Sequence, residues 1–269
     1  MTPTILAMGG GGFTMEPDNP ALDDYVLELA GPREPRILFL PTASGDPAAQ
    51  IAAFHQRFGD KACRAEHLSL FRLHGTTRPV EEILLDQDVI YVGGGSMRNL
   101  LAIWKAHGLD DVFREAWRRG IVLAGLSAGA MCWFEGAVTK SMGRPEPIAG
   151  LGLLPGSLTV HADGEPERLP VWLEAVRSGA LPGGWAADDG VALVFRDRTL
   201  ERVVSSRPER TALRADAVDG ELLRKRLQPE LLGVAPGVGG RGVDYVDEDV
   251  RELRRVARIR GGHGARPWR

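Results

Sequence analysis

Short apolar runs alternate with amphipathic segments along the first half of the chain. Continuous apolar runs predict buried strands, and they cover Thr4–Met8, Arg36–Leu40, Ala65–Phe71, Asp88–Val92 and Ile121–Ala124. Between these runs apolar residues recur at helical spacing, which predicts helices over Asp18–Leu29, Ala48–Phe58, Val80–Leu85, Met97–His107 and Asp110–Arg119. This alternation predicts a mostly parallel central sheet with helices on both faces, a three-layer α/β sandwich.

The pattern changes in the second half of the chain. Residues 135–156 are rich in glycine and proline, and the pattern there predicts little helix. Further signals are a strand end at Leu158–His161, a helix at Pro170–Val176, a hairpin of Gly190–Phe195 with Leu200–Ser205, and a strand at Thr211–Val218. No break marks a second domain, so residues 1–269 are treated as one α/β domain with a frayed basic tail from about residue 251.

Composition excludes several classes of protein. The chain has 269 residues and a formal net charge of −3, which does not indicate a nucleic-acid partner. Its two cysteines, Cys63 and Cys132, form neither a metal-binding pair nor a disulfide framework. The chain lacks a signal peptide pattern and an apolar run long enough to span a membrane. We therefore expect a cytoplasmic protein that needs no membrane, cofactor or metal, and leave open whether it forms a homodimer.

Three glycine-rich turns follow predicted strands, at Gly9–Gly12, Gly93–Gly95 and Gly125–Gly129. In open α/β sheets the functional site lies beyond the carboxyl ends of the strands, so these turns are expected to converge there. The third turn has the G-x-S-x-G pattern of a nucleophile elbow, which places Ser127 at the apex of a sharp strand-to-helix turn. The alternative is a glycine-rich turn whose serine only caps a helix.

A nucleophilic serine needs a base and an oxyanion hole. Of the six histidines, His161 is the favoured base because it ends a predicted strand, and His263 is the other candidate. The backbone amides of Ala128 and Gly94 are expected to form the oxyanion hole, since glycine permits close approach of the backbone.

These motifs together resemble the peptidase E / cyanophycinase family of serine peptidases. The resemblance spans about residues 4 to 220 and is carried by Tyr91–Ser96, Gly125–Phe134, Gly150–Gly156, His161–Glu165 and Ala187–Leu193. It implies a glutamine-amidotransferase-like (flavodoxin-like) α/β sandwich with Ser127 as nucleophile and His161 as base. It also implies hydrolysis of short peptides, above all dipeptides with an N-terminal aspartate.

The acid that would orient the base is not settled by the resemblance. Relatives carry an acidic residue soon after the nucleophile, where this chain reads Thr139-Lys140-Ser141. Glu135 is favoured because it follows the elbow closely, and Glu146 and Asp163 are the other candidates.

Two further points depend on the resemblance. Aspartate selectivity would need a cation, and Arg98, Arg144 and Arg168 lie near site-forming segments. The base segment also departs from the family, because relatives tend to have Pro-His-Tyr where this chain reads Val160-His161-Ala162.

Two other functions are compatible with the same motifs. An α/β-hydrolase-type esterase would use the same elbow, with Asp188 or Asp189 as acid and His263 as base. The second alternative is a non-catalytic relative that binds a small acidic ligand. Lys140 and the altered base segment motivate this alternative.

Overall fold

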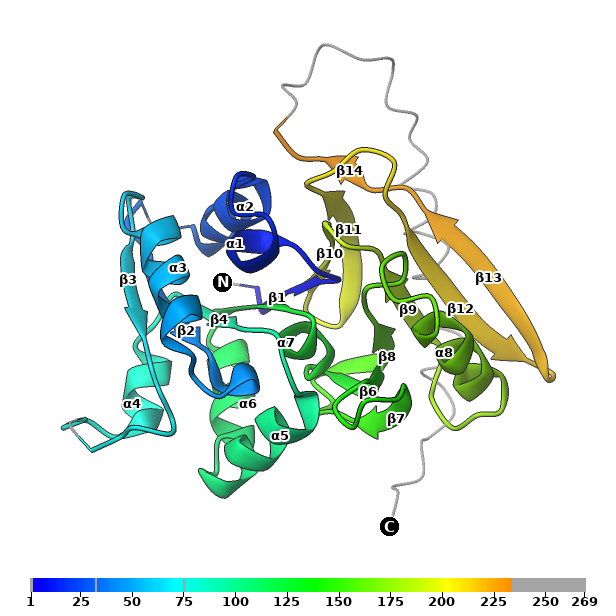
Figure 1. Ribbon diagram of the computed structural model, residues 1–269, viewed down its shortest axis with the longest axis horizontal. Helices are drawn as coiled ribbons and strands as arrows, with labels where there is room; N and C mark the ends of the chain where they lie inside the picture. The colour runs from blue at the N-terminus through cyan, green and yellow to red at the C-terminus, as the bar shows by residue number, and fades with distance from the viewer. Residues whose placement is uncertain (1, 32, 75, 234–269) are drawn as a thin grey trace.

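The computed structural model describes residues 2–31, 33–74 and 76–233, which form two β-sheets with helices (Figure 1). The first sheet has eight strands within this part of the chain, in the order β14-β11-β10-β1-β5-β4-β2-β3. Its strands are β1 Thr4–Met8, β2 Arg36–Leu40, β3 Arg64–His67, β4 Val89–Val92, β5 Val122–Leu126, β10 Val191–Arg196, β11 Thr199–Ser205 and β14 Glu230–Leu231. The predicted α/β class is confirmed.

The core of the first sheet is parallel, as the sequence predicts. Strands β1, β5, β4, β2 and β3 run parallel to their neighbours, and β10 and β11 extend the sheet as an antiparallel hairpin. Only the third strand ends earlier than expected, at His67 rather than Phe71.

Helices cover both faces of this sheet because its strands are apolar on both sides. In β1, Ile5 and Ala7 join one hydrophobic cluster, whereas Leu6 and Met8 join another on the opposite face. The first cluster packs against α4 Val80–Leu85, α5 Met97–Ala106 and α6 Asp110–Arg118. The second packs against α1 Gly12–Met15, α2 Ala21–Ala30 and α3 Ala48–Phe58. The first sheet is therefore the middle of a three-layer arrangement.

A second sheet lies beside the first and is not predicted by the sequence (Figure 1). Its order is β13-β12-β9-β8-β6-β7. Its strands are β6 Phe134–Thr139, β7 Glu146–Ala149, β8 Leu154–Thr159, β9 Gly184–Ala187, β12 Ala212–Val218 and β13 Glu221–Leu227, and α8 Arg168–Arg177 packs on it. The glycine- and proline-rich stretch 135–156 is thus largely strand. Its Pro147 lies in β7 at the sheet edge, where a missing N–H is tolerated.

An aromatic cluster joins the two sheets into a continuous core. Phe134 and Trp185 belong to the second sheet and Phe195 to the first, and their ring centroids lie 5.2–5.9 Å apart. The four-residue helix α7, Ala128–Met131, contacts β1 and β5 of the first sheet and β6 and β8 of the second. The expected basic tail from residue 251 lies outside the described residues. In the described part of the chain no helix is long and apolar enough to cross a membrane.

Candidate active site

The turn between β5 and α7 holds Ser127 in an unusual backbone conformation. Its φ is 52° and its ψ is −114°, a region that non-glycine residues rarely adopt. A Cβ added at Gly125 would lie 2.2 Å from the carbonyl oxygen of Gly129, and one at Gly129 would lie 2.3 Å from that of Val92. The two glycines of the G-x-S-x-G pattern are therefore required by the close packing of this turn. The Ser127 amide donates to the carbonyl of Met8, 3.0 Å away, which ties the turn to β1.

His161 lies directly against this serine. It follows β8, also has a positive φ (54°), and its backbone amide donates to the carbonyl of Gly9. The Nε2 atom of His161 lies 2.9 Å from Ser127 Oγ, and the imidazole side chain is 13% exposed. The structure thus brings together the predicted nucleophile and the predicted base, although they are 34 positions apart in the sequence.

The second ring nitrogen of His161 faces Asp189 in the turn between β9 and β10. Nδ1 lies 2.5 Å from Asp189 Oδ1. Burial raises the pKa of this carboxyl group, but the hydrogen bond and charge of His161 and the charges of Arg207 and Arg210 outweigh burial, and the net pKa is lower than usual. Asp189 is therefore ionised at neutral pH and accepts a hydrogen bond from Nδ1–H, which leaves the lone pair of Nε2 free to accept the Ser127 hydroxyl proton. This arrangement activates a serine for attack on a carbonyl carbon.

The expectation that Glu135 orients the base is corrected by the structure. Glu135 lies in β6, and its carboxylate accepts a hydrogen bond of 2.9 Å from the Gly156 amide instead of contacting His161. Glu146 forms an ion pair with Arg98. Asp163, the third candidate, is near His161 but bonds to other groups, described below.

Two sequence signals point to Asp189, the acidic pair Asp188-Asp189 at a strand end and its place in the segment Ala187–Leu193, which carries part of the family resemblance. The esterase alternative used that pair, but with His263, which lies outside the described residues. In the structure the Asp189 carboxylate is already engaged by His161.

The two amides expected to form an oxyanion hole lie beside the serine. A Cβ added at Gly94 would lie 3.3 Å from the Ser127 Cβ and 2.8 Å from a methyl carbon of Leu126, so glycine brings this backbone close to the serine and a larger residue would displace Leu126. Ala128 follows Ser127 directly at the start of α7. Within the described residues, neither the Gly94 nor the Ala128 amide donates a hydrogen bond to another residue. Both are thus available to an added acceptor near Ser127 Oγ.

The first glycine turn packs against the histidine–aspartate pair. A Cβ added at Gly10 would lie 2.0 Å from Asp189 Oδ1 and 3.0 Å from His161 Nδ1. The Gly10 carbonyl accepts from the Gly190 amide, 3.1 Å away, so the turn after β1 contacts the turn that carries Asp189. The three glycine-rich turns therefore converge as the sequence predicts.

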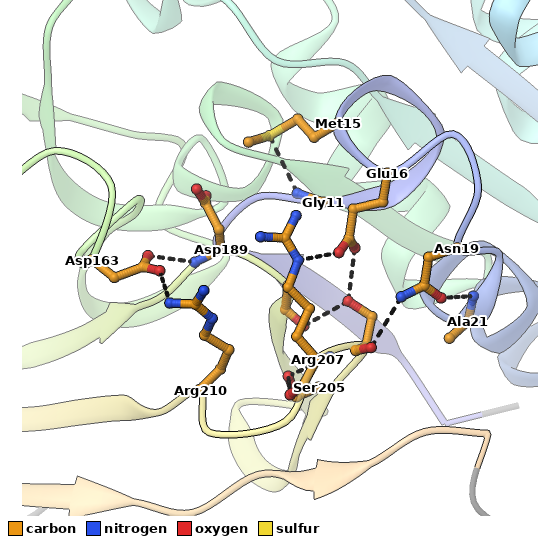
Figure 2. A network of polar contacts seen from close by, with 12 residues as sticks. Gly11, Met15, Glu16, Asn19, Ala21, Asp163, Asp189, Ser205, Arg207 and Arg210 are labelled. Atoms are coloured by element: carbon orange, nitrogen blue, oxygen red, sulfur yellow. Dashed lines mark hydrogen bonds and ion pairs between the residues drawn. The ribbon is translucent and has the colours of Figure 1, made fainter.

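Two arginines border the site on the segment between β11 and β12 (Figure 2). Arg207 forms an ion pair with the buried Glu16, whose other carboxylate oxygen accepts from the Ser206 hydroxyl at 2.7 Å. Arg210 forms an ion pair with Asp163. Among the residues that the structure describes, no group of three or more His, Cys, Asp or Glu side chains is placed to hold a metal ion.

The three arginines proposed from the sequence do not reach this site. Arg98 is engaged by Glu146, and Arg168 is buried and bonded to Glu165 and to the Val138 carbonyl. Arg144 is an exposed residue of the loop between β6 and β7.

Comparisons with known proteins agree with this geometry. The family model described as Peptidase family S51 matches residues 5–203. The uncharacterized peptidase YgaJ of Bacillus subtilis (strain 168) is 46% identical over 229 residues, which are 85% of this chain and 99% of that protein.

Two solved structures share the fold. A peptidase from an acI-B1 actinobacterium has a TM-score of 0.65 at 20% identity, over 85% of this chain and 95% of its own. A candidate peptidase E from Listeria monocytogenes EGD-e has a TM-score of 0.51 at 18% identity, over 85% of this chain and 100% of its own. The resemblance to the peptidase E family is confirmed, and the chain belongs to peptidase family S51.

Proposed function

We propose that this protein is a serine peptidase that hydrolyses short peptides through an acyl-enzyme on Ser127. One observation carries the proposal, the unbroken hydrogen-bonded series from Ser127 Oγ through His161 to the ionised Asp189. A peptidase of the same family needs no other nucleophile, because the serine, the base and the orienting acid are already in contact.

The reaction follows from this geometry. His161 Nε2 takes the Ser127 hydroxyl proton as the oxygen attacks the peptide carbonyl carbon, and Asp189 stabilises the imidazolium that forms. The strained turn is the nucleophile elbow, and the amides of Gly94 and Ala128 hold the negative oxygen of the tetrahedral intermediate. His161 then protonates the leaving amine. Water, activated by the same base, releases the acyl group from Ser127.

The finer substrate class is an extension of the same proposal. The resemblance implies dipeptides with an N-terminal aspartate, whose side-chain carboxylate needs a cation near the scissile bond. Arg207 and Arg210 both carry charge close enough to lower the pKa of Asp189, and because Arg210 is paired with Asp163, Arg207 is the candidate. Glu16 holds its Nε, and its two terminal nitrogens donate no hydrogen bond within the described residues. We also propose that the three-layer arrangement is a glutamine-amidotransferase-like α/β sandwich.

Two variants test the proposal. We expect wild-type protein to cleave Asp-Leu and to be labelled by a fluorophosphonate probe, and Ser127→Ala to lose both properties. Asp189→Asn should retain the fold but lower kcat by about 10⁴-fold, because an amide favours the wrong histidine tautomer. Hydrolysis of Asp-Leu by Ser127→Ala at the wild-type rate would refute the assignment of the nucleophile.

Substrate choice is tested separately. Arg207→Gln should raise the KM for Asp-Leu by about 10- to 100-fold, the loss of one charge-assisted contact, and leave Ala-Leu hydrolysis nearly unchanged. Arg177→Gln, at an exposed arginine on α8, is the matched control. Equal effects of Arg207→Gln on both dipeptides would argue against a carboxylate-binding role. A parallel assay with p-nitrophenyl acetate distinguishes a general esterase, which would prefer the ester to every peptide.

A further inference from the structure

The turn that carries Asp189 has to be held rigidly if its carboxylate is to point at His161. The turn is short, with Asp188 and Asp189 followed by Gly190 at a φ of 82°, and the Val191 amide donating back to the Asp188 carbonyl. The Asp189 backbone N–H is not part of that turn bond and needs an acceptor of its own.

Asp163 supplies that acceptor. Its Oδ1 accepts from the Asp189 amide at 2.8 Å, and its Oδ2 receives the guanidinium of Arg210 (Figure 2). Both side chains are largely covered, with 24% of Asp163 and 36% of Arg210 exposed. One carboxylate thus joins the backbone of the acid to a cation on a third segment.

Each end of this link belongs to a segment that already contacts the site. Asp163 lies two residues after His161, and the Ala162 amide between them donates to the Ala187 carbonyl. Arg210 precedes Thr211, whose amide donates to the Asp188 side chain at 2.9 Å. The base segment, the acid turn and the segment between β11 and β12 are therefore tied together around Asp189.

We propose that Asp163 and Arg210 are positioning residues, which hold the Asp189 carboxylate in line with His161 Nδ1. This role rests on the proposed peptidase function for its kinetic consequence, but the alignment itself is a property of the folded protein. Neither residue contacts the serine or the histidine ring, so both act through Asp189.

Charge explains why the two residues are needed together. Asp163 accepts from the backbone amide of Asp189, and its charge contributes to the raised pKa of Asp188, after burial and against the hydrogen bond from Thr211. Without Arg210, Asp163 would place an uncompensated negative charge beside the acid. Arg207 is the other cation that faces Asp189, and its own guanidinium is occupied on one side by Glu16.

The expected consequence is a change in kcat rather than in KM. A tilt of Asp189 by about 1 Å breaks the bond to Nδ1 and lowers the rate by up to about 100-fold, while substrate contacts stay as they were. Asp163→Asn keeps an oxygen that can accept from the Asp189 amide, so it should retain most of the activity that Asp163→Ala loses.

The experiment combines kinetics with proton NMR. In wild-type protein the His161 Nδ1 proton, shared with Asp189, is expected to resonate far downfield of other ring N–H signals. That signal should be lost or moved upfield in Asp163→Ala and Arg210→Gln, and retained in Asp163→Asn. Asp60→Ala and Arg177→Gln, at exposed positions, are the matched controls. The double variant Asp163→Ala/Arg210→Gln should lose less than the product of the two single effects, because Arg210 positions Asp189 through Asp163 and adds directly only its own charge.

The outcomes separate the positioning role from the proposed function. A downfield signal and a kcat unchanged in Asp163→Ala, relative to Asp60→Ala, would overturn the positioning role. So would a wild-type protein that shows no such signal, since the aligned pair would then be absent. A wild-type protein with the signal, lost in Asp163→Ala, but without activity on any dipeptide would count against the peptidase and leave the positioning role standing. Thermal unfolding of each variant checks that it is folded at the assay temperature.

Discussion

Gly10 is the position where one added methyl group tests the geometry of the site most directly. Alanine at this position would place its Cβ 2.0 Å from Asp189 Oδ1 and 3.0 Å from His161 Nδ1. Ordinary contact begins at 3.4 Å, so the carboxylate oxygen would have to move by about 1.4 Å, the difference between 3.4 and 2.0 Å. The 2.5 Å bond between Asp189 and His161 cannot survive such a movement. Gly10→Ala therefore separates the Asp189 carboxylate from His161 without changing Ser127, His161 or Asp189.

The magnitude lies between two limits. Misplacement of a catalytic group by about 1 Å lowers the rate by about 10²-fold, and complete loss of the acid's contribution lowers it by about 10⁴-fold. These factors correspond to about 3 to 5 kcal/mol of transition-state stabilisation. We expect kcat/KM for Asp-Leu to fall within this range, with most of the change in kcat.

Gly143→Ala is the control for general destabilisation. Gly143 has a φ of 85°, and no atom lies within 4 Å of its added Cβ. Alanine there should cost about 1 kcal/mol of folding stability through backbone strain alone and leave kcat/KM unchanged. A Gly10→Ala protein with kcat/KM within about threefold of wild type would refute the view that this turn packs against the working acid and base.

Two further predictions concern stability. At Ser127, whose φ is 52°, Ser127→Gly should be more stable than Ser127→Ala by about 1 kcal/mol in chemical denaturation, because only glycine adopts this conformation without strain, and both should lose fluorophosphonate labelling. Burial raises the pKa of Asp23 to about 7, against the opposing charge of Arg57. Since the folded state then holds the proton more tightly than the unfolded state, the free energy of unfolding should fall as pH rises from about 4 to 7, by up to about 1.4 kcal/mol per pH unit, and Asp23→Asn should flatten that dependence. An identical pH dependence of unfolding in wild type and Asp23→Asn would contradict the assigned protonation.

The parallel core of the fold could be predicted because its signals are local. Strand β1 is a continuous apolar run, and its residues divide between the two faces of the sheet, so hydrophobicity alone marks it. Strand β7 is different. It holds Pro147, its side chains alternate between half-buried and exposed, and among the described strands it pairs only with β6. Nothing in its composition separates it from a loop, because its pairing with β6 is what makes it a strand.

The same distinction explains which residues of the site could be found. Ser127 and His161 each end a strand, and each stands in a motif that can be recognised without knowing its neighbours in space. Sequence proximity to Ser127 favours Glu135 as the acid. In the structure, β6 carries Glu135 away from the serine, toward the amide of Gly156. Proximity in the sequence therefore predicts the wrong acid, because the residue that contacts His161 is set by the path of the chain from β9 to β10.

That passage also says what the second sheet contributes. Ser127 follows β5 of the first sheet, His161 follows β8 of the second, and Asp189 lies where the chain leaves β9 of the second sheet for β10 of the first. The contact between serine and histidine thus depends on how the two sheets sit against each other, and Asp189 belongs to the segment that joins them. The hydrogen bonds from the Asp189 amide to Asp163 and from the Thr211 amide to Asp188 cross the same junction. The first sheet with its helices would supply only the nucleophile, Ser127. The second sheet supplies His161, and the junction between the two sheets holds Asp189, which orients that histidine.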